Sequence, residues 1–285
     1  MEKPLYKSLL VVLLFYSSLS LVYAQKKPDI RGNKSVAVVD KVLDPFYAIV
    51  VEEDMALSFK KGEHPMVHFI ADDNLPPVFK FEVKDSVLHI SSYYRIRSYK
   101  ELKIEVTYVA LESIDIVEGI VKIAINSNPS ALAITTKNKA EVEVFGMADS
   151  VSLNLNDNSR VKLTSSLNQL TAEVAHRSQL TLSGKFLTST IALSGRAAVV
   201  GHGTTDELDI KLAAESYFDG KALKVDRAIV AMNDTSVADV YAEQSLALSL
   251  NQQARLNLYG NAHLEINQFL GSSQLHKIPV SSSKQ

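Results

Sequence analysis

One pattern of side-chain sizes returns seven times between about Leu132 and Gly260, and its period is nineteen residues. The residue before each polar corner recurs along the chain at steps of 19, 19, 19, 19, 20 and 18. A fixed period of this length predicts a solenoid, in which each repeat forms one coil stacked on the next. The positions that precede the corners are Thr136, Leu155, Val174, Leu193, Leu212, Met232 and Leu250.

Apolar and polar residues alternate inside each repeat, as in the run Val151-Ser152-Leu153-Asn154-Leu155. A period of two is typical of a β-strand with one buried face. The sequence therefore predicts an all-β protein, a right-handed parallel β-helix with coils of about 19 residues around a packed interior. From the length of the repeat we expect a roughly triangular coil.

Two columns of small residues accompany the corners. The first contains Ala140, Ser159, Ser178, Ala197, Ser216, Ser236 and Ala254, and the spacing of 19 extends it to Val121 and Ser273. The second contains Gly146, Ser165, Gly184, Gly203, Ala222, Ala242 and Gly260. We interpret both as packing features that permit positive φ or close approach of the next coil. A phosphate cradle is the weaker alternative, because no Lys-Ser/Thr and no helix follow the glycines.

The segment 1–24 forms a separate unit. Lys3 and Lys7 precede an apolar run that ends at Ala24, which predicts a signal peptide over 1–24. An uncleaved membrane anchor is the alternative, although the run is short for a span of about 20 residues. No second apolar run of that length follows, so we expect an exported protein of the periplasm, outer surface or extracellular space with no membrane span after cleavage.

Composition narrows the remaining possibilities. The chain has no cysteine, which leaves no disulfide framework and no site for a lipid-modified cysteine. A formal charge of −2 argues against a nucleic-acid partner, which requires a concentrated basic surface. Because it has no disulfides, an exported chain of this kind must be held together by packing.

The rest of the chain divides into three parts. Residues 25–110 contain short runs rich in branched and aromatic residues, separated by turn signals such as Lys61-Gly62, and predict an N-terminal β-rich region that caps one end. Residues 111–280 form the coils, and residues 281–285 are a polar tail. A β-solenoid needs covered ends, and we expect the segment after Gly271 to close the other one.

Several motifs of the N-terminal region occur together in one known family. They are Arg31-Gly32-Asn33, Ala71-Asp72-Asp73-Asn74-Leu75-Pro76, Phe81 to Ile90, Leu102 to Val106 and Leu111 to Ile114. With these motifs the chain resembles the head GIN domain family of secreted bacterial envelope proteins, and the resemblance extends to about Ile278. It implies a parallel β-helix and cell-surface adhesion. The Ser-Gly corners usual in the family are mostly replaced here, and Ser194-Gly195 is the clearest that remains.

Charged residues on outward positions offer two candidate pairs. Asp219 and Asp239 fall on neighbouring coils about 5 Å apart, a separation that suits glycoside hydrolysis or a hard cation. We favour two solvated acids, because no third acid or arginine joins them in the column. Glu143 and Lys162 are expected to form a surface ion pair of small energetic value.

Histidines do not indicate a metal centre. The seven histidines are scattered, and His64 and His68 come nearest to the spacing of a zinc site. They lie on a turn and a strand, so they would not share one helical face. We expect no metal, no cofactor and no catalytic residue.

The most distinctive local composition runs from Tyr93 to Lys100. Its tyrosines and cations suit stacking on sugar rings or contact with anionic glycans. A solvated hairpin tip with tyrosines lying back on the sheet is the simpler interpretation. The candidate binding residues are Tyr93, Tyr94, Arg95, Arg97 and Tyr99.

The leading functional hypothesis is a non-catalytic, adhesin-like β-solenoid that binds a cell-surface glycan or an envelope protein. One alternative is a polysaccharide lyase or hydrolase, which would need an acid or arginine cluster on one face. The other is a structural envelope protein that self-associates through its ends or an uncovered sheet. Fold alone does not choose among these three.

Overall fold

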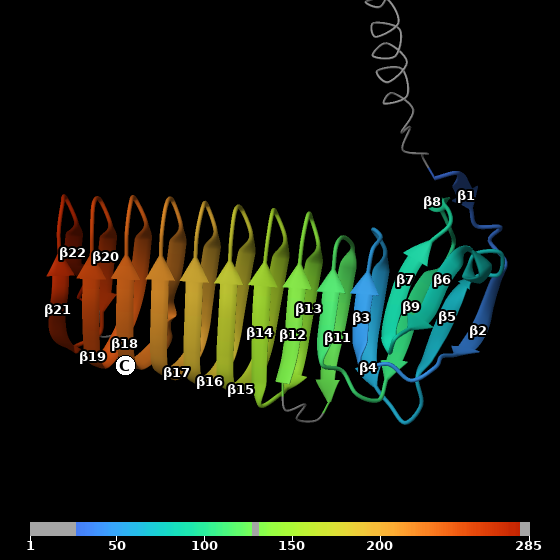
Figure 1. The fold of residues 1–285 in the computed structure, drawn as a ribbon, viewed down its shortest axis with the longest axis horizontal. Helices are drawn as coiled ribbons and strands as arrows, with labels where there is room; N and C mark the ends of the chain where they lie inside the picture. The colour runs from blue at the N-terminus through green and yellow to red at the C-terminus, as the bar shows by residue number, and fades with distance from the viewer. Residues whose placement is uncertain (1–26, 127–130, 280–285) are drawn as a thin grey trace, which may run out of the picture.

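A computed structural model describes residues 27–126 and 131–279 as a rod of stacked coils with a β-rich head at one end (Figure 1). The predicted signal peptide and the polar tail lie outside these residues. Strands and one 3₁₀ turn account for the regular structure of the described residues, which confirms the all-β prediction. In this part of the chain, no helix is both long and apolar enough to cross a membrane.

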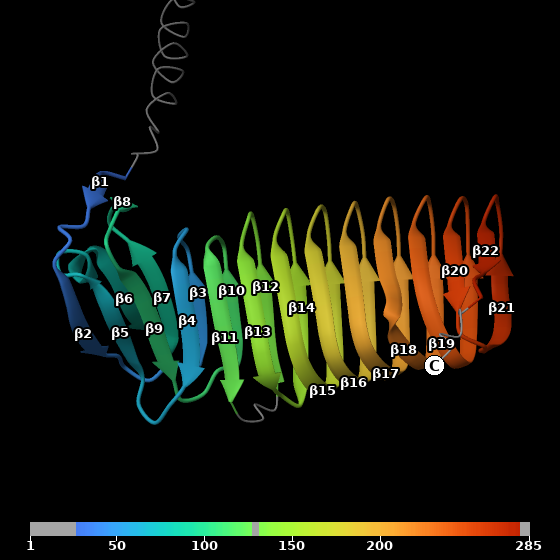
Figure 2. The same ribbon diagram turned by 180° about the vertical axis from the view of Figure 1, so that it is seen from behind.

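Each coil consists of two strand segments and one tight turn. In β15 (Arg160–Val174), residues 160–166 pair in parallel with β13 (Glu141–Met147) and residues 169–174 pair with β14 (Ser150–Leu155). The first segments of successive coils thus form one sheet and the second segments another, here called the first-segment and second-segment sheets. The coils wind in a right-handed sense, as predicted, but with two sides where the repeat length suggested three (Figures 1 and 2).

The other strands belong either to the coils or to the head. Those of the coils are β3 (Ala48–Val51), β4 (Ala56–Lys61), β10 (Ser113–Ile116), β11 (Ile120–Asn126), β12 (Ala131–Thr136), β16 (Gln179–Leu193), β17 (Ala198–Leu212), β18 (Tyr217–Met232), β19 (Val237–Leu250), β20 (Arg255–Tyr259), β21 (His263–Phe269) and β22 (Gln274–Lys277). Those of the head are β1 (Asp29–Arg31), β2 (Val36–Val42), β5 (Met66–Asp72), β6 (Phe79–Lys84), β7 (Val87–Ser92), β8 (Arg95–Ser98) and β9 (Leu102–Tyr108), with the 3₁₀ turn Pro76–Val78 before β6.

The interior is built from columns of aliphatic side chains. Leu155, Val174 and Leu193 are register partners in consecutive coils and are at most 3% exposed, which confirms the predicted inward column. The column continues through Leu212, Met232 and Leu250. Because each coil adds one layer of such side chains, a coil gains its stability mainly from its neighbours.

The tight turns explain the columns of small residues. One residue of each turn has positive φ, and in this chain most of these residues are not glycine: Asn138, Asp157, His176, Gly195, Ala214, Asp234, Gln252 and Gly271. Two positions later a small buried residue such as Ser159 turns back into the core, where its hydroxyl donates to the Asn156 carbonyl at 2.9 Å. The left-handed position costs a non-glycine residue about 1–2 kcal/mol, which accounts for the Ser-Gly corners usual in the family.

One end of the first small column differs from the prediction. Ile120 pairs with Glu141, so the coil between them is two residues longer than the repeat, and Gly119, not Val121, precedes Ala140 in the column. Val121 instead pairs with Val142 and points inward. At the other end Gln274 pairs with Arg255, which places Ser273 after Ala254 as expected.

The second small column permits close approach of neighbouring coils at its glycines, as predicted, but Ala222 does not belong to it, because Gly203 pairs with Leu223. A Cβ at Gly184 would lie 1.8 Å from the Ser165 carbonyl oxygen, and one at Gly203 would lie 1.9 Å from the Gly184 carbonyl oxygen. Both residues have positive φ. A side chain at Gly184 or Gly203 would therefore push adjacent coils apart.

The head is inserted into the solenoid. β3 and β4 form a coil that pairs directly with β10 and β11, although the head strands β5 to β9 separate them in sequence. The head extends both sheets. β7 pairs with β3 and β9 pairs with β4, both in parallel. Further out, β6 pairs with β7, β5 with β9 and β2 with β5, all in the antiparallel sense. Phe69, Phe79 and Phe81 fill the space between these extensions, with ring centroids 5.6–6.4 Å apart, so the head covers the first coil.

A buried carboxylate fastens the connections of the head. Asp72 accepts hydrogen bonds from the backbone N–H groups of Lys34 at 2.9 Å, Lys100 at 3.2 Å and Glu101 at 3.1 Å. Burial alone would raise the pKa of Asp72, but these donors outweigh it and hold the pKa below its ordinary value. A Cβ at Gly32 would lie 2.1 Å from Asp72 Oδ2, so only glycine fits there.

The same site joins the motifs that carry the family resemblance. Asn33 donates its backbone N–H to Asn74 Oδ1 at 3.0 Å and its side-chain amide to Asp73. Asn74 in turn donates to the Arg31 carbonyl at 2.9 Å. Two motifs that are distant in sequence thus form one polar clasp.

Both ends of the rod carry a lysine on an inward column. At the head end, Lys41 of edge strand β2 pairs with buried Val67 and donates to the Phe81 carbonyl at 3.3 Å. At the other end, Lys277 follows Leu258 in its column and donates to the Gly260 carbonyl. Inward charges of this kind oppose the stacking of further strands on an exposed edge.

The segment after Gly271 covers the second end incompletely. It forms β22, which pairs with β20 as part of the last coil. Ile266, Phe269 and Leu270 of the preceding segment remain 53%, 44% and 49% exposed. We predicted that the tail after Gly271 closes this end. Residues 271–279 instead complete the last coil, and residues 280–285 lie outside the described residues.

The inward and outward assignment can be tested in β15. We expect Val174→Asp to lower the free energy of unfolding by about 4 kcal/mol or more, because it buries an unpaired charge between two coils. Glu173→Ser, on the adjacent exposed position, should leave the melting temperature nearly unchanged. Similar melting temperatures for the two variants would contradict the assignment.

The clasp at Asp72 gives the head a dependence on pH. Folding lowers the pKa of Asp72, so its ionised carboxylate stabilises the folded head above the unfolded pKa near 4. This stabilisation is lost as the pH falls through the folded pKa. We expect Asp72→Asn to melt at a lower temperature at pH 7, with the difference from wild type shrinking toward pH 2. A difference in melting temperature between the two proteins that stays constant from pH 7 to pH 2 would refute this role.

Candidate functional site

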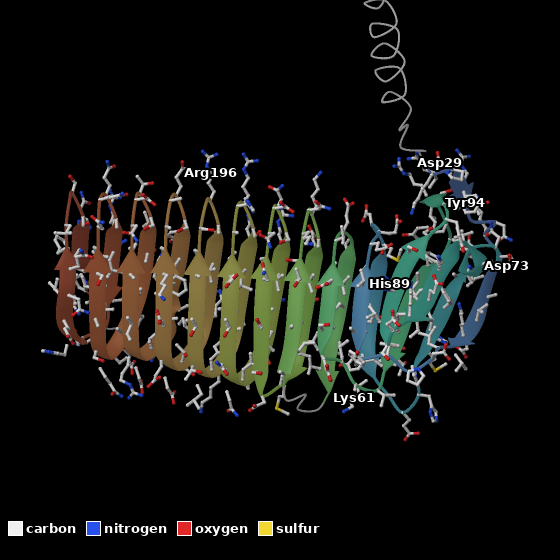
Figure 3. The ribbon with its side chains drawn as sticks, viewed as in Figure 1. Asp29, Lys61, Asp73, His89, Tyr94 and Arg196 are labelled. Carbon is white, nitrogen blue, oxygen red and sulfur yellow. The ribbon has the colours of Figure 1, made fainter. Side chains whose placement is uncertain are left out.

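A cleft of about 700 Å³ lies where the head meets the first coils. One wall is the tip of the head, with Tyr94, Arg95 and Tyr99, and the other is formed by the turns Glu53–Ala56 and Glu118–Ile120. These turns stand at the edge of the rod that carries the tight turns, which is also where Tyr94 and Asp29 project (Figure 3). The floor contains buried Phe79 and Met55.

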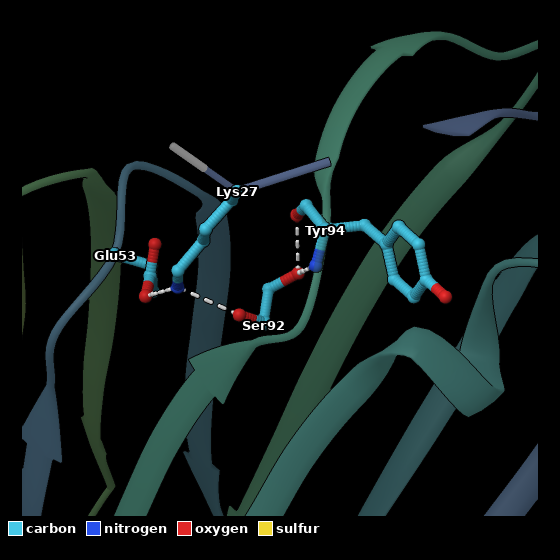
Figure 4. A network of polar contacts seen from close by, with 4 residues as sticks. All are labelled: Lys27, Glu53, Ser92 and Tyr94. Carbon is cyan, nitrogen blue, oxygen red and sulfur yellow. Dashed lines mark hydrogen bonds and ion pairs between the residues drawn. The ribbon is translucent and has the colours of Figure 1, made fainter. Parts of the chain in front are cut away.

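The N-terminal strand holds the tip in place. β1 pairs in parallel with β8, and Arg95 donates its N–H to the Pro28 carbonyl at 2.9 Å. Lys27 then crosses the cleft mouth, forming an ion pair with Glu53 and donating to the Ser92 carbonyl at 2.6 Å (Figure 4). The Ser92 hydroxyl closes a small loop with the backbone of Tyr94, donating to its carbonyl at 2.6 Å. The tip is thus held both by its pairing with β1 and by the hydrogen bond between Ser92 and Tyr94.

The structure brings three of the five predicted binding residues together. Tyr94, Arg95 and Tyr99 line the cleft, with 38% of Tyr94 and 54% of Tyr99 exposed. Tyr93 is 56% exposed and does not line the cleft. Arg97 forms an ion pair with Asp29 at 2.9 Å and so fastens β1 to β8.

Other residues of the cleft were missed by the sequence reasoning. Glu53, Asp54 and Glu118 lie in turns of two coils that are adjacent only because the head is an insertion. In the sequence Glu118-Gly119 is typical of a corner, and nothing in its spacing points to the tyrosines. With Lys27 and Arg95 the cleft holds three carboxylates and two cations, so it does not present a strongly basic surface.

The carboxylates Asp219 and Asp239 are neighbours in register, as predicted, but they are not free acids. Lys221 lies between them, 3.4 Å from Asp219 and 3.5 Å from Asp239. Tyr217 and Asn257 donate to opposite oxygens of Asp239 at 2.7 and 2.8 Å. Asp239 is buried, with both oxygens engaged, and the expectation of two solvated acids was wrong for it.

A β-bulge explains why the cluster contains Lys221. Gly220 pairs with Val240, but Lys224 pairs with Tyr241, so residues 221–223 are extra in β18. The bulge carries Lys221 back over the carboxylates. Burial, together with donation to Asp239, raises the pKa of Tyr217 to about 12. Burial opposes the charge of Lys221, but Asp239 and Asp219 raise its pKa overall.

The remaining candidate pairs are surface contacts. Lys162 donates to Glu143 at 3.3 Å, as expected, and this bond with the charge of Lys162 lowers the pKa of Glu143. His68 contacts Asp40 rather than His64, with 2.5 Å between His68 Nδ1 and Asp40 Oδ1. Among the residues that the structure describes, no group of three or more His, Cys, Asp or Glu side chains could hold a metal ion.

Comparisons with solved structures agree on the fold. A crystal structure of a "putative adhesin" from Parabacteroides distasonis has a TM-score of 0.61 at 15% identity, covering 87% of this chain and 100% of that one. A "putative adhesin" from Parabacteroides merdae gives 0.60 at 15% identity, with 88% and 100% covered. A "putative lipid binding protein" from Parabacteroides distasonis gives 0.57 at 17% identity, with 87% and 100% covered.

The sequence comparisons identify the family. No curated protein matches this chain. One family profile, described as "putative auto-transporter adhesin, head GIN domain", matches residues 45–262, which include the first coil, most of the head and nearly all later coils. The chain therefore belongs to the head GIN domain family of adhesin-like β-solenoids.

Proposed function

We propose that this protein is an exported, non-catalytic adhesin that binds a neutral cell-surface glycan in the cleft between the head and the first coils. The observation that carries the proposal is the meeting of exposed tyrosine rings with carboxylates and an arginine in one cleft of about 700 Å³. Aromatic faces pack against the C–H faces of sugar rings, and charged side chains exchange strong hydrogen bonds with hydroxyl groups.

The charges of the cleft favour a neutral ligand. Glu53 is paired with Lys27, which leaves Asp54 and Glu118 facing Arg95 across the cleft. A polyanionic glycan would meet this excess of carboxylates and be repelled. Hydroxyl groups can accept from Arg95 and donate to the acids, so a neutral polyol satisfies both kinds of group.

The arrangement of the acids supports a binding role over the enzyme alternative. A glycosidase needs two carboxyl groups that reach the same glycosidic bond. Asp219 and Asp239 lie side by side but are bridged by Lys221, and both oxygens of Asp239 are already engaged. The best acid pair on the coils therefore acts to fasten the bulge of β18.

Features of the two ends favour a monomeric rod over the self-associating alternative. Lys41 and Lys277 occupy inward columns at opposite ends. β21 carries a bulge at Asn267, since Leu248 pairs with Ile266 but Ser249 pairs with Gln268. A bulge and an inward charge both interrupt the regular edge that another strand would need.

The glycan proposal is tested by retention on immobilised polysaccharides. We expect wild type to be retained on a neutral polysaccharide such as mannan, xylan or cellulose, and less on hyaluronan. The triple variant Tyr94→Ala, Arg95→Ala, Tyr99→Ala should lose at least tenfold in affinity, equivalent to about 1.4 kcal/mol. Tyr93→Ala, which removes an exposed tyrosine outside the cleft, serves as the matched control. Equal retention of the triple variant and wild type would count against the cleft.

The end-protection argument is tested by Lys277→Leu. The change should extend the inward column and leave an apolar edge, so we expect concentration-dependent growth in light scattering at a retained melting temperature. Lys277→Arg, which keeps the charge, should remain like wild type. A monomeric Lys277→Leu variant at high concentration would show that the inward lysine does not protect the end.

A further inference from the structure

A second hollow, of about 400 Å³, lies on the outer face of the second-segment sheet in the last third of the rod. It spans β17, β18, β19 and β21, far along the rod from the cleft of the head (Figure 1). The lining side chains project from successive coils at the same two levels. The lower level holds Glu207, Arg227, Ser245 and His263, and the upper level holds Asp209, Ile229, Ala247 and Glu265.

Differences in side-chain size make the hollow. Ser245 and Ala247 of β19 are short and form its floor. Arg227 and Ile229 rise on one side and His263 and Glu265 on the other, and the strands that carry these walls are about 10 Å apart. A ligand one ring wide can therefore enter the hollow from the outer face.

The hollow is lined by an apolar wall and by unpaired acids. Ile229 is 57% exposed, an unusual position for a large aliphatic side chain on this polar face. Glu207 is engaged by Arg227 at 2.6 Å. Within the described residues, Asp209 and Glu265 have no ion-pair partner, so the hollow has negative charge on both flanks of its apolar wall.

We infer that this hollow binds an amino sugar, a hexosamine ring with a free ammonium group. The ring would pack its C–H face on Ile229 and Ala247, and its ammonium group would meet the carboxylate of Glu265 or Asp209. Arg227, Ser245 and His263 supply further groups that hydrogen-bond with hydroxyls. A pocket with one apolar wall and a few convergent polar groups is typical of a small-ligand site.

A lysine-bearing peptide offers the same ammonium group but fits the surface less well. Extended peptides are usually captured by an open strand edge, whose backbone groups they pair with. The strands under the hollow are hydrogen-bonded to neighbours on both sides, apart from terminal β21. The hollow therefore has side-chain partners to offer and few backbone ones.

The inference goes beyond the glycan proposed for the cleft and stands independently of it. The two sites share no residue and lie far apart along a rod of coils spaced about 4.8 Å apart. If both are occupied, one molecule can bridge two glycan chains. Bridging of that kind raises overall avidity without any new contact.

The experiment is calorimetric titration of the full chain with a glucosamine tetramer at low salt. N-acetylated glucosamine tetramer, cellotetraose and tetralysine are the comparison probes. We expect the cleft triple variant (Tyr94→Ala, Arg95→Ala, Tyr99→Ala), which cannot take cellotetraose in the cleft, to bind the glucosamine tetramer at least tenfold more tightly than each of the other three. Ala247→Leu, which fills the floor, and Glu265→Gln, which removes one charge, should each weaken this binding at least tenfold.

Two controls separate this site from folding and from the cleft. Ala192→Leu enlarges an outward alanine of the same sheet outside the hollow and should bind like wild type. The triple variant of Tyr94, Arg95 and Tyr99 should also keep its glucosamine binding even if it loses neutral polysaccharide. The inference is overturned if wild type does not bind the tetramer, if the cleft triple variant binds tetralysine or cellotetraose equally well, or if Ala247→Leu leaves the affinity unchanged.

Discussion

Parallel hydrogen bonding between successive coils is the constraint on which the structure depends. Every coil must place its inward side chains directly over those of the coil before, because a slip of one residue would turn its apolar set toward solvent. Leu155, Val174 and Leu193 show the result, as register partners that are almost fully buried. The chain keeps this register even where a coil changes length. The coil from Leu212 to Met232 is one residue longer than the repeat, and the next, to Leu250, is one residue shorter.

The irregular coils carry two features of the surface described above. The extra residues of β18 form a bulge that carries Lys221 over Asp219 and Asp239, and Tyr217 and Asn257 complete the cluster around buried Asp239. The following coil presents only Ser245 and Ala247 between larger neighbours, which leaves a hollow. The regular coils between Glu141 and Leu193 carry ion pairs between facing residues, such as Arg160 with Glu141.

The head supplies what a repeating rod lacks. It covers the first coil with an aromatic cluster and ends in a strand whose inward lysine interrupts stacking. It also builds a cleft, because its tip folds back against the turns of the coils next to it. Asp72 holds that tip by accepting from the backbone of Lys100 and Glu101, so the packing of the head and the shape of the cleft depend on the same carboxylate.

The sequence by itself determined the coils, their inward columns and the positions of most tight turns, because a period of 19 with alternation inside it has one solution as a β-solenoid. It also indicated the tyrosine-rich tip through composition alone. Three features were decided only by the tertiary structure: the two-sided coil, the insertion of the head strands β5 to β9 between β4 and β10, and the bulge that brings Lys221 to the acids. Each depends on pairing between strands distant in sequence, and a local pattern does not specify its partner. For that reason Tyr94 could be identified from its neighbours, whereas Glu53 and Glu118 became part of the same cleft only when the first coil closed around the insertion.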